Sequence, residues 1–558
     1  MNLRTIRWLV LLVTLAGFAW RVHGLAQQSL WRDEVDAVYF ALRPLDDTLS
    51  MFRLPAQNGP LYFLALRPWL QWAGATEFAL RYPSAMAGVL GIPLIWQVAR
   101  RLLPPGPRAR LHASADSPTG DIRGPSPEPA GVSQPATADN NLYAATPAPE
   151  ESPDEALAPW LATLFFAVNP YQLWYGQEGK MYSGITALVL LATWCWLVGV
   201  ERGGWRPWLA YLGSVSVAMY AHLLSVLLIP LHLIWFVIAW PQSRRHRLGY
   251  ALTLAGLTLP YLPMVWWQWE LLITDERKTG FSFTPLTEMV QVIILNHMRG
   301  FLPPAEAVWL APIFFLGMAG LVLGVGEIGA PRHGALPHLA AWRRFGLVLA
   351  WFAAPVGVIY LLSLRQPVFT DRYLIWVGPA LLMVLALGVS ALRSNAGRLG
   401  NLLAIIAVVY LVGYWAHAGW QQKSQPTKYD LASAVGYIVE HRTPGSLLIL
   451  QIPHMEYAYR YYSSDFGSAP FQESDARLGA WMGGLWTNNG LADDLAYAQV
   501  EAQMQQQTAG YRDLWVLRSE VEMWDPRYLM DRWLDAHGTL VDQAHFTGAQ
   551  VRHYVLNP

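Results

Sequence analysis

The chain has 558 residues, of which 54% are hydrophobic and only 14% are charged. A water-soluble domain carries about 25% charged residues, so this composition excludes an ordinary soluble protein and favours a chain that crosses a membrane many times. The formal net charge is zero, which gives no electrostatic basis for binding nucleic acid. The 28 tryptophans suit the membrane–water interface, where the indole ring is buried and its N–H stays hydrated.

Eleven apolar stretches approach the length of about 20 residues that a bilayer-spanning helix needs. They lie near residues 6–25, 77–99, 158–176, 181–200, 205–221, 222–240, 248–268, 306–326, 346–363, 372–392 and 399–417. A shorter run at 57–74 contains Arg67 and Pro68 and is a weaker candidate. The predicted fold class is therefore mainly α: a polytopic transmembrane helical bundle of about 11–12 spans.

Clusters of basic residues predict the orientation, because positively charged loops stay on the cytoplasmic side. Such clusters occur at residues 4–7, 100–110, 244–247, 332–344 and 393–398. They predict a cytoplasmic N-terminus, eleven spans and an extracytoplasmic C-terminus, provided that 57–74 lies half-buried at the outer surface without crossing. We expect a multi-pass protein of a prokaryotic plasma (inner) membrane. Four segments would then share the outer face: 26–76, 174–184, the region around His222, and 365–373.

Composition divides the chain into four parts. Residues 1–103 form an N-terminal transmembrane part with the first outer loop, and 159–424 form the rest of the bundle. Between them, 104–158 is rich in proline and poor in aromatic residues, which predicts a disordered cytoplasmic insertion. Residues 425–558 predict a small extracytoplasmic α/β domain. Its strands are expected at 446–452 and 514–519 and in a hairpin of 539–546 and 549–556, and its helices in "KYDLASAVGYIVEH" and "DPRYLMDRWLDAH", the latter with Pro just after a capping Asp.

The adjacent carboxylates Asp33 and Glu34 follow the first apolar run in "SLWRDEVDAVYF". A carboxylate at the membrane surface is able to act as a general base toward an acceptor hydroxyl. Neighbouring helical side chains diverge by about 100°, so at most one of the two points into a given cavity. The alternative interpretation is the N-terminus of a short amphipathic helix over 34–43, where both carboxylates complement the helix dipole. The two interpretations are compatible.

Other ionisable residues lie at the outer ends of expected spans, where their cost makes them functional candidates. Lys180 suits an anionic phosphate, and Arg372 offers a fork of donors to the same group. The alternatives are a snorkelling lysine beside Glu178, a hydrogen-bonded core histidine at 222, and an arginine that anchors the interface. HExxH, CxxC and Walker A motifs are absent from the sequence. The sequence leaves open whether Asp33 and Glu178 share a divalent ion.

Five segments, in order along the chain, resemble motifs of the GT-C glycosyltransferases of the protein O-mannosyltransferase and aminoarabinose lipid A transferase type. "LWRDEVDAVYF" is similar to a W-x-D-E element, and 58–88 resembles a stretch written H-P-P-L-Y…E-x-A-L-R-L-P-S-A-L-A-G. "NPYQLWYGQEGKMYSG" resembles P…Y-x-Q-E-x-R-M-Y, "YAHLL" a Y-T-H-Y element, and "DRYLIW" a late R-Y-L element. The chain departs from the family at Asn58-Gly59 (commonly His-Pro), at Lys180 (commonly Arg) and at Ala221 (commonly Thr).

The resemblance implies a sugar donor linked to a polyprenyl phosphate and direct inverting displacement, with no covalent intermediate. Asp33 would be the catalytic base and Glu34 would orient the site or the acceptor. Lys180, His222 and Arg372 would contact the leaving phosphate. The implied substrate-binding set is Arg32, Glu178, Lys180, Tyr182, His222, Arg372 and Tyr373, with no metal ligands and no cofactor. The acceptor (a hydroxyl or amine of a protein, glycolipid or polymer) is not specified. A transporter or flippase for a lipid-linked or sugar substrate, and a membrane receptor that binds saccharide, are the alternatives.

Overall fold

A computed structural model describes most of the chain. The described residues are 3–53, 59–103, 157–273, 282–301, 309–326, 341–395, 397–452, 455–463, 478–479 and 491–557. Residues 157 and 158, expected to end the insertion, already belong to a helix, and the remaining 104–156 lie outside the described residues.

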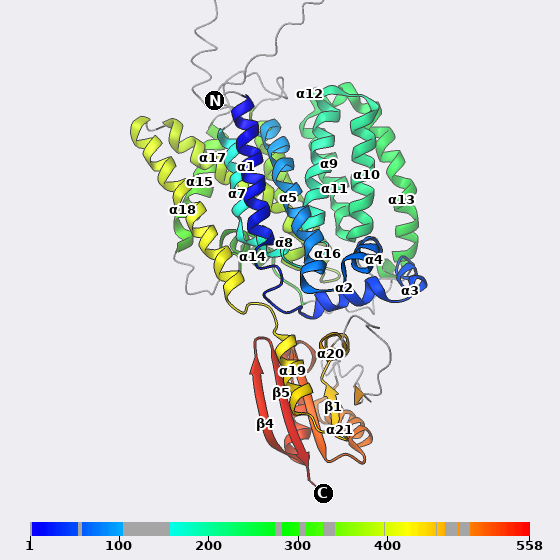
Figure 1. The fold of residues 1–558 in the computed structure, drawn as a ribbon. Coiled ribbons are helices and arrows are strands. Elements are labelled where there is room, and N and C mark those ends of the chain that lie inside the picture. The colour runs from blue at the N-terminus through cyan, green and yellow to red at the C-terminus, as the bar shows by residue number, and fades with distance from the viewer. Residues whose placement is uncertain are drawn as a thin grey trace, which may run out of the picture.

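The larger part of the molecule is a bundle of long helices that run roughly side by side (Figure 1). They are α1 (Leu3–Val22), α5 (Glu77–Leu102), α7 (Leu157–Val168), α9 (Tyr182–Arg202), α10 (Trp205–Ala221), α11 (Leu228–Ile238), α13 (Arg247–Ile273), α15 (Ala311–Gly326), α16 (Ala341–Ser363), α17 (Gly378–Asn395) and α18 (Gly397–Ser424). Within the described part, seven helices are long and apolar enough to cross a membrane, and three shorter apolar helices accompany them. The protein is thus a multi-pass helical membrane protein, as predicted.

Three expected spans are interrupted at the end of the bundle that lies toward the C-terminal domain. The expected span 158–176 is two helices, because Asn169 caps α8 (Pro170–Gly176) with its side chain and Pro170 removes a backbone donor. The span 222–240 begins with extended backbone at His222 and the 3₁₀ turn η1 (Leu223–Leu227). The span 372–392 begins with the 3₁₀ helix η4 (Asp371–Val377). These interruptions turn side chains of the span ends toward one region.

Three short helices form a layer across one end of the bundle. They are α2 (Arg32–Leu42), α3 (Leu45–Ser50) and α4 (Pro60–Ala73), which lie beside one another next to the C-terminal domain (Figure 1). Helix α4 has 14 residues, about 21 Å at 1.5 Å per residue, which is shorter than the hydrocarbon core of a bilayer. Its Phe63, Leu66 and Leu70 pack into a core shared with α2. Residues 60–73 of the expected run at 57–74 therefore form a helix on the bundle end; the predicted eleven-span orientation requires that this run does not cross. Helix α14 (Leu286–Arg299) packs on α8 at the same end.

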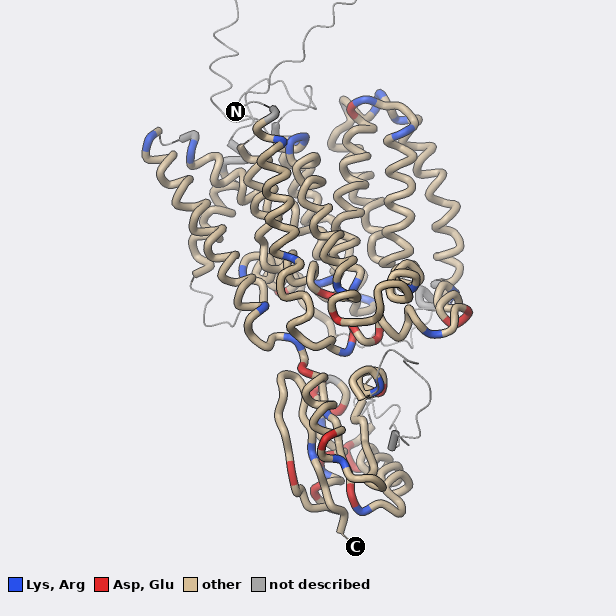
Figure 2. The backbone as a smooth tube through the Cα atoms, in the orientation of Figure 1, with Lys and Arg blue, Asp and Glu red and all other residues tan. Residues whose placement is uncertain are grey.

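The charges are distributed unequally between the two ends of the bundle. A group of Lys and Arg residues lies at the end that carries the N-terminus, opposite the C-terminal domain (Figure 2). It includes Arg101, Arg202 and Arg393, each in the last turn of its helix. This distribution is the one expected under the predicted orientation, with the basic end in the cytoplasm and the C-terminal domain outside; the orientation itself stays a prediction.

The C-terminal domain is a five-stranded sheet with helices on both faces. The strands are β1 (Leu447–Leu450), β2 (Leu478–Gly479), β3 (Asp513–Ser519), β4 (Gly538–Phe546) and β5 (Ala549–Leu556), in the order β2-β1-β3-β5-β4. β1 is parallel to β2 and β3, whereas β3, β5 and β4 are antiparallel. The helices are α19 (Leu431–His441), α20 (Met455–Ser463), α21 (Asp493–Thr508), α22 (Val521–Trp524) and α23 (Leu529–His537).

The predicted strands and hairpin are confirmed, and one predicted helix start is wrong. The Asp525 carboxylate does accept hydrogen bonds from backbone N–H groups, but they are those of Leu529 and Met530. Helix α23 consequently begins three residues after Pro526, at Leu529.

The sheet joins the two parts of the molecule. Alternating side chains of a strand face opposite ways, so Leu448, Leu450 and Trp515 face one side, and Leu447 and Ile449 the other. The first set belongs to one hydrophobic core that also contains residues of α2, α4, α19 and α20. The C-terminal domain is therefore packed against the helix layer that carries the Asp33-Glu34 pair.

Candidate active site

Asp33 and Glu34 lie in the first turn of α2. The helix starts at Arg32, two residues earlier than expected, and its dipole favours both carboxylates at this position. Because adjacent helical side chains diverge by about 100°, the two carboxylates have different partners, as the sequence predicted. Asp33 keeps some exposure, at 14%, whereas the Glu34 side chain is fully buried, at 0%.

Glu34 is the centre of a buried ion network. Arg81 donates to both carboxylate oxygens, from Nε at 2.7 Å and from Nη2 at 2.6 Å. The Nζ of Lys428 lies 3.2 Å from Oε1, and the N–H of Gly179 donates to the same oxygen at 2.7 Å. Burial raises the pKa of Glu34, but Arg81 and Lys428 outweigh burial and lower it to about 2. The Glu34 carboxylate thus connects α2 with α5, with the loop before α9 and with the linker to the C-terminal domain. These contacts support a role for Glu34 in orienting the site.

Asp33 lies between cations from distant parts of the chain. Its Oδ2 accepts a hydrogen bond from Nη1 of Arg372 at 3.0 Å, and its Oδ1 one from Nη2 of Arg32 at 3.3 Å. Burial raises the pKa of Asp33, but the charges of Lys180, Arg372 and Arg32 together outweigh it, so the pKa lies below its ordinary value. The side chain is therefore ionised at neutral pH, the state in which it accepts a proton.

Tyr182, His222 and Tyr373 surround the guanidinium group of Arg372. The His222 ring centroid lies 4.8 Å from that of Tyr373 and 6.0 Å from that of Tyr182. The Arg372 guanidinium lies 6.0 Å from the centroid of Tyr182 and 5.8 Å from that of Trp31. His222 is 1% exposed, and neither ring nitrogen has a hydrogen-bond partner within the described residues. Groups that are far apart in the sequence thus meet in one place.

Lys180 carries a charge that no carboxylate of the described residues neutralises at close range. Its Nζ lies 5.8 Å from the Phe63 ring centroid, and the described part of the chain offers it no salt bridge within 4.0 Å. Its charge still acts on Asp33 and Asp36. An ammonium group held beside a carboxylate without pairing is available to an anionic ligand.

Glu178 belongs to the edge of the buried network. It is 1% exposed, and its Oε1 has no hydrogen-bond partner among the described residues. Burial raises the pKa of Glu178 to about 7, with Lys428 lowering it and Glu34 raising it. No group of three or more His, Cys, Asp and Glu side chains that could hold a metal ion occurs in the described ranges.

Several residues of this region were missed by sequence reasoning. Asp36 lies one helical turn after Asp33, and burial raises its pKa to about 7. Its i,i+3 spacing from Asp33 was the available signal. Asp371 accepts hydrogen bonds at 2.7 Å from both Tyr171 and Asn296 and so fixes the start of η4 next to Arg372. Arg81 matches the arginine of the A-L-R-L-P-S stretch quoted above, which was its available signal. Lys428 had no local signal, because its partner Glu34 lies 394 residues away.

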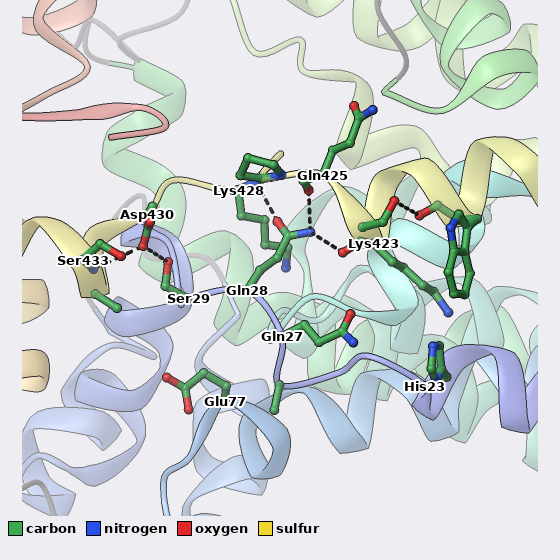
Figure 3. Close-up of a pocket in the computed structure, with 15 residues that line it drawn as sticks. His23, Gln27, Gln28, Ser29, Glu77, Lys423, Gln425, Lys428, Asp430 and Ser433 are labelled. Carbon is green, nitrogen blue, oxygen red and sulfur yellow. Dashed lines mark hydrogen bonds between the residues drawn. The ribbon is translucent and has the colours of Figure 1, made fainter. Parts of the chain in front are cut away.

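A cavity of about 640 Å³ lies beside this network, between the first outer loop, the end of α18 and the linker (Figure 3). Its polar groups hold the linker: the Gln28 side-chain amide donates to the carbonyls of Gln422 and Gln425, and its oxygen accepts from the N–H of Lys428. Asp33 does not line this cavity. The cavity therefore marks the attachment of the C-terminal domain.

No family model matches the chain, and no curated protein matches it in sequence. Solved structures match over nearly its whole length. ArnT from Cupriavidus metallidurans aligns in the apo state with a TM-score of 0.52 at 12% identity, and bound to undecaprenyl phosphate with 0.53 at 13%. Each alignment covers 98% of this chain and 97% of the other. The archaeal oligosaccharyltransferase AglB from Archaeoglobus fulgidus, in complex with an inhibitory peptide and a dolichol-phosphate, aligns with 0.52 at 11% identity, over 99% of this chain and 74% of the other.

These sequence identities are low. What this chain shares with the matched structures is the path of the backbone through the helical bundle and the C-terminal domain. The chain has the GT-C membrane fold that its sequence motifs implied.

Proposed function

We propose that this protein is a membrane glycosyltransferase that moves a sugar from a polyprenyl-phosphate donor to a hydroxyl or amine at the outer face of the membrane. One observation carries the proposal: the Asp33 carboxylate and the Arg372 guanidinium, 339 residues apart, meet at 3.0 Å beside the unpaired charge of Lys180. The undecaprenyl phosphate bound to ArnT and the dolichol-phosphate bound to AglB support a lipid phosphate as the donor's carrier.

The donor phosphate would lie against Lys180 and Arg372. Both cations stand next to Asp33, and the departing lipid phosphate needs charge compensation as its negative charge grows. Leu223, next to His222 in the sequence, lines a small crevice of about 20 Å³ together with Met51 and Met264, and these apolar side chains would contact the isoprenoid chain. The site would thus hold the phosphate at headgroup depth with the sugar toward Asp33.

Asp33 would act as the general base. It removes the proton from the acceptor oxygen or nitrogen while that atom forms a bond to the anomeric carbon, and the bond from this carbon to the phosphate oxygen breaks with its electron pair. The configuration inverts because attack and departure occur on opposite faces. The cations that lower the pKa of Asp33 are partly neutralised once they bind the phosphate, so donor binding strengthens the base.

A transfer assay tests this function. The purified full chain in lipid vesicles, given radiolabelled undecaprenyl-phosphate hexose or pentose and a membrane extract, should move label to an acceptor. Lys180→Met should lower kcat/KM for the donor by about 10- to 100-fold, because a hydrogen bond to a charged group contributes about 1.5–3 kcal/mol. Lys180→Arg should retain most activity because it keeps the charge. Equal rates for Lys180→Met and the wild type would remove Lys180 from the donor site.

The orientation is tested by cysteine labelling. In a Cys195→Ala background, a cysteine introduced at exposed Asp46 on α3 should react with a membrane-impermeant maleimide in intact cells. A cysteine at exposed Arg398, at the start of α18, should react only after permeabilisation. The physical reason is that the basic end of the bundle faces the cytoplasm. The reverse pattern would place Asp33 on the cytoplasmic side and contradict the proposed function.

A further inference from the structure

Glu520 belongs to the C-terminal domain, yet it reaches the surroundings of Asp33. It follows β3 directly, and its Oε2 lies 3.0 Å from Nη1 of Arg32. The other terminal nitrogen of Arg32, Nη2, lies 3.3 Å from Oδ1 of Asp33. The Glu520 and Arg32 side chains are only 6% and 14% exposed. One guanidinium group therefore bridges a carboxylate of the membrane part and a carboxylate of the outer domain.

The backbone at Glu520 is strained. Its φ is +51°, in the left-handed region, and within the described residues it shares a positive φ with only one other non-glycine residue, Tyr528. This conformation is unfavourable for a non-glycine residue, and glycine would adopt it without that cost. Strain of this kind persists where the surroundings enforce it and clusters at functional sites. Glu520 thus occupies a backbone conformation that its residue type disfavours.

The position of Glu520 relative to Asp33 is set by firm contacts. Ser519 donates from its hydroxyl to the carbonyl of Gly548 at 2.8 Å and so holds the end of β3. The linker is fastened by Gln28 and by the Lys428–Glu34 ion pair. Residues of β1, β3 and α2 share one hydrophobic core. Glu520 is accordingly presented to Arg32 by a docked domain.

We propose that Glu520 is a positioning residue of the active centre, through which the C-terminal domain controls how strongly Arg32 pairs with Asp33. The proposal rests on the proposed function, because it assigns Asp33 the role of base. With Glu520 ionised, Arg32 divides its charge between two carboxylates. Without that second carboxylate, Arg32 pairs with Asp33 alone, and the base is held more tightly and becomes weaker.

Other charged groups around Asp33 also act on its carboxylate. The cations are Arg32, Lys180 and Arg372. The carboxyl groups of Asp36, Glu178 and Glu520 also act on it, as do the phenols of Tyr182 and Tyr429. Burial raises the pKa of Glu520, with Arg32 lowering it and Asp33 raising it, and the result lies above its ordinary value. The Glu520 charge is therefore most complete at alkaline pH, where its removal has the largest effect.

The experiment compares the pH profile of transfer for the full chain and its Glu520→Gln variant in the same vesicles. We expect the plateau of kcat at neutral and alkaline pH to fall by about 3- to 10-fold, because the pKa of the base falls when the Glu520 charge is removed. The two pH profiles should converge toward acidic pH, where Glu520 of the wild type is itself protonated. The KM for the donor should stay unchanged. Glu522→Gln, an exposed neighbour on α22, is the matched control and should behave as the wild type.

A second variant separates positioning from stability. Glu520→Gly removes the same carboxylate but relieves the strained backbone, so it should lose activity as Glu520→Gln does while its thermal stability stays equal or rises. Glu520→Asp, which keeps the charge, should restore part of the rate. A wild-type pH profile in Glu520→Gln, or loss of activity that follows loss of stability in both variants, overturns the proposal. If instead Asp33→Asn is fully active, the proposed function itself fails; an inactive Asp33→Asn with an unaltered Glu520→Gln refutes the role of Glu520 alone.

Discussion

Asp33→Asn is expected to lower sugar transfer by about 10²- to 10⁴-fold, the contribution of a positioned general base. Asparagine has the same shape and still offers an oxygen to Arg372, but it does not accept the acceptor's proton. The side chain is partly exposed, so the fold should be retained. The measurement is the steady-state rate with radiolabelled undecaprenyl-phosphate sugar and the full chain in vesicles.

The same substitution should leave donor binding intact or tighten it. Removing the carboxylate frees the charges of Arg32, Lys180 and Arg372 for the phosphate, so the KM for the donor should not rise. Asp46→Asn, an identical change at an exposed position of α3, is the control and should have wild-type activity. Unchanged transfer by Asp33→Asn would remove it from the role of base. Movement of donor lipid across the vesicle membrane, with no transfer by either protein, would support the flippase alternative.

Glu34→Gln is expected to destabilise the protein by about 3–5 kcal/mol, the typical cost of breaking a buried ion pair. The substitution leaves Arg81 and Lys428 buried without their counter-charge, although the amide still accepts one hydrogen bond. The linker and the first outer loop should loosen together, because Glu34 bonds to both α5 and Lys428. Thermal unfolding in detergent and protease cleavage after α18 measure these effects. Glu440→Gln, at an exposed position of α19, is the matched control.

The pH dependence of stability provides an independent measurement of Glu34. Its pKa in the folded protein, about 2, lies below its ordinary value of about 4.3. A carboxylate with a lowered pKa contributes its full stabilisation above the unfolded-state pKa and loses it as the pH falls toward the folded-state value. The wild type should therefore lose stability between about pH 4.3 and pH 2, and Glu34→Gln should lose less over that interval. Equal acid sensitivity of the two proteins would contradict the assignment.

The helical bundle could be predicted because membrane insertion depends on local hydropathy. The approximate positions of the long helices followed from runs of apolar residues. The condition that the run containing α4 does not cross the membrane followed from the positions of the basic clusters. The interruptions were not predicted. Pro170 follows directly on an apolar run, and the extended backbone at His222 precedes one, so overall hydropathy did not mark where the helices break. The start of α23 was also misplaced, since the Asp525 side chain caps the helix from a turn that the sequence pattern does not reveal.

For the candidate site, the sequence by itself determined which carboxylates open a helix at the outer surface, and its motif order named Lys180, His222 and Arg372 as their companions. Only the tertiary structure decided the separate roles of the pair: Asp33 faces Arg372 and Arg32, while Glu34 is enclosed by Arg81 and Lys428. It also brought Glu520 of the outer domain to Arg32. The physical reason is the distance in sequence over which each interaction acts. Hydropathy and helix starts sum contributions from neighbours in sequence, whereas an ion pair depends on distance and burial, which exist only after segments hundreds of residues apart have packed together.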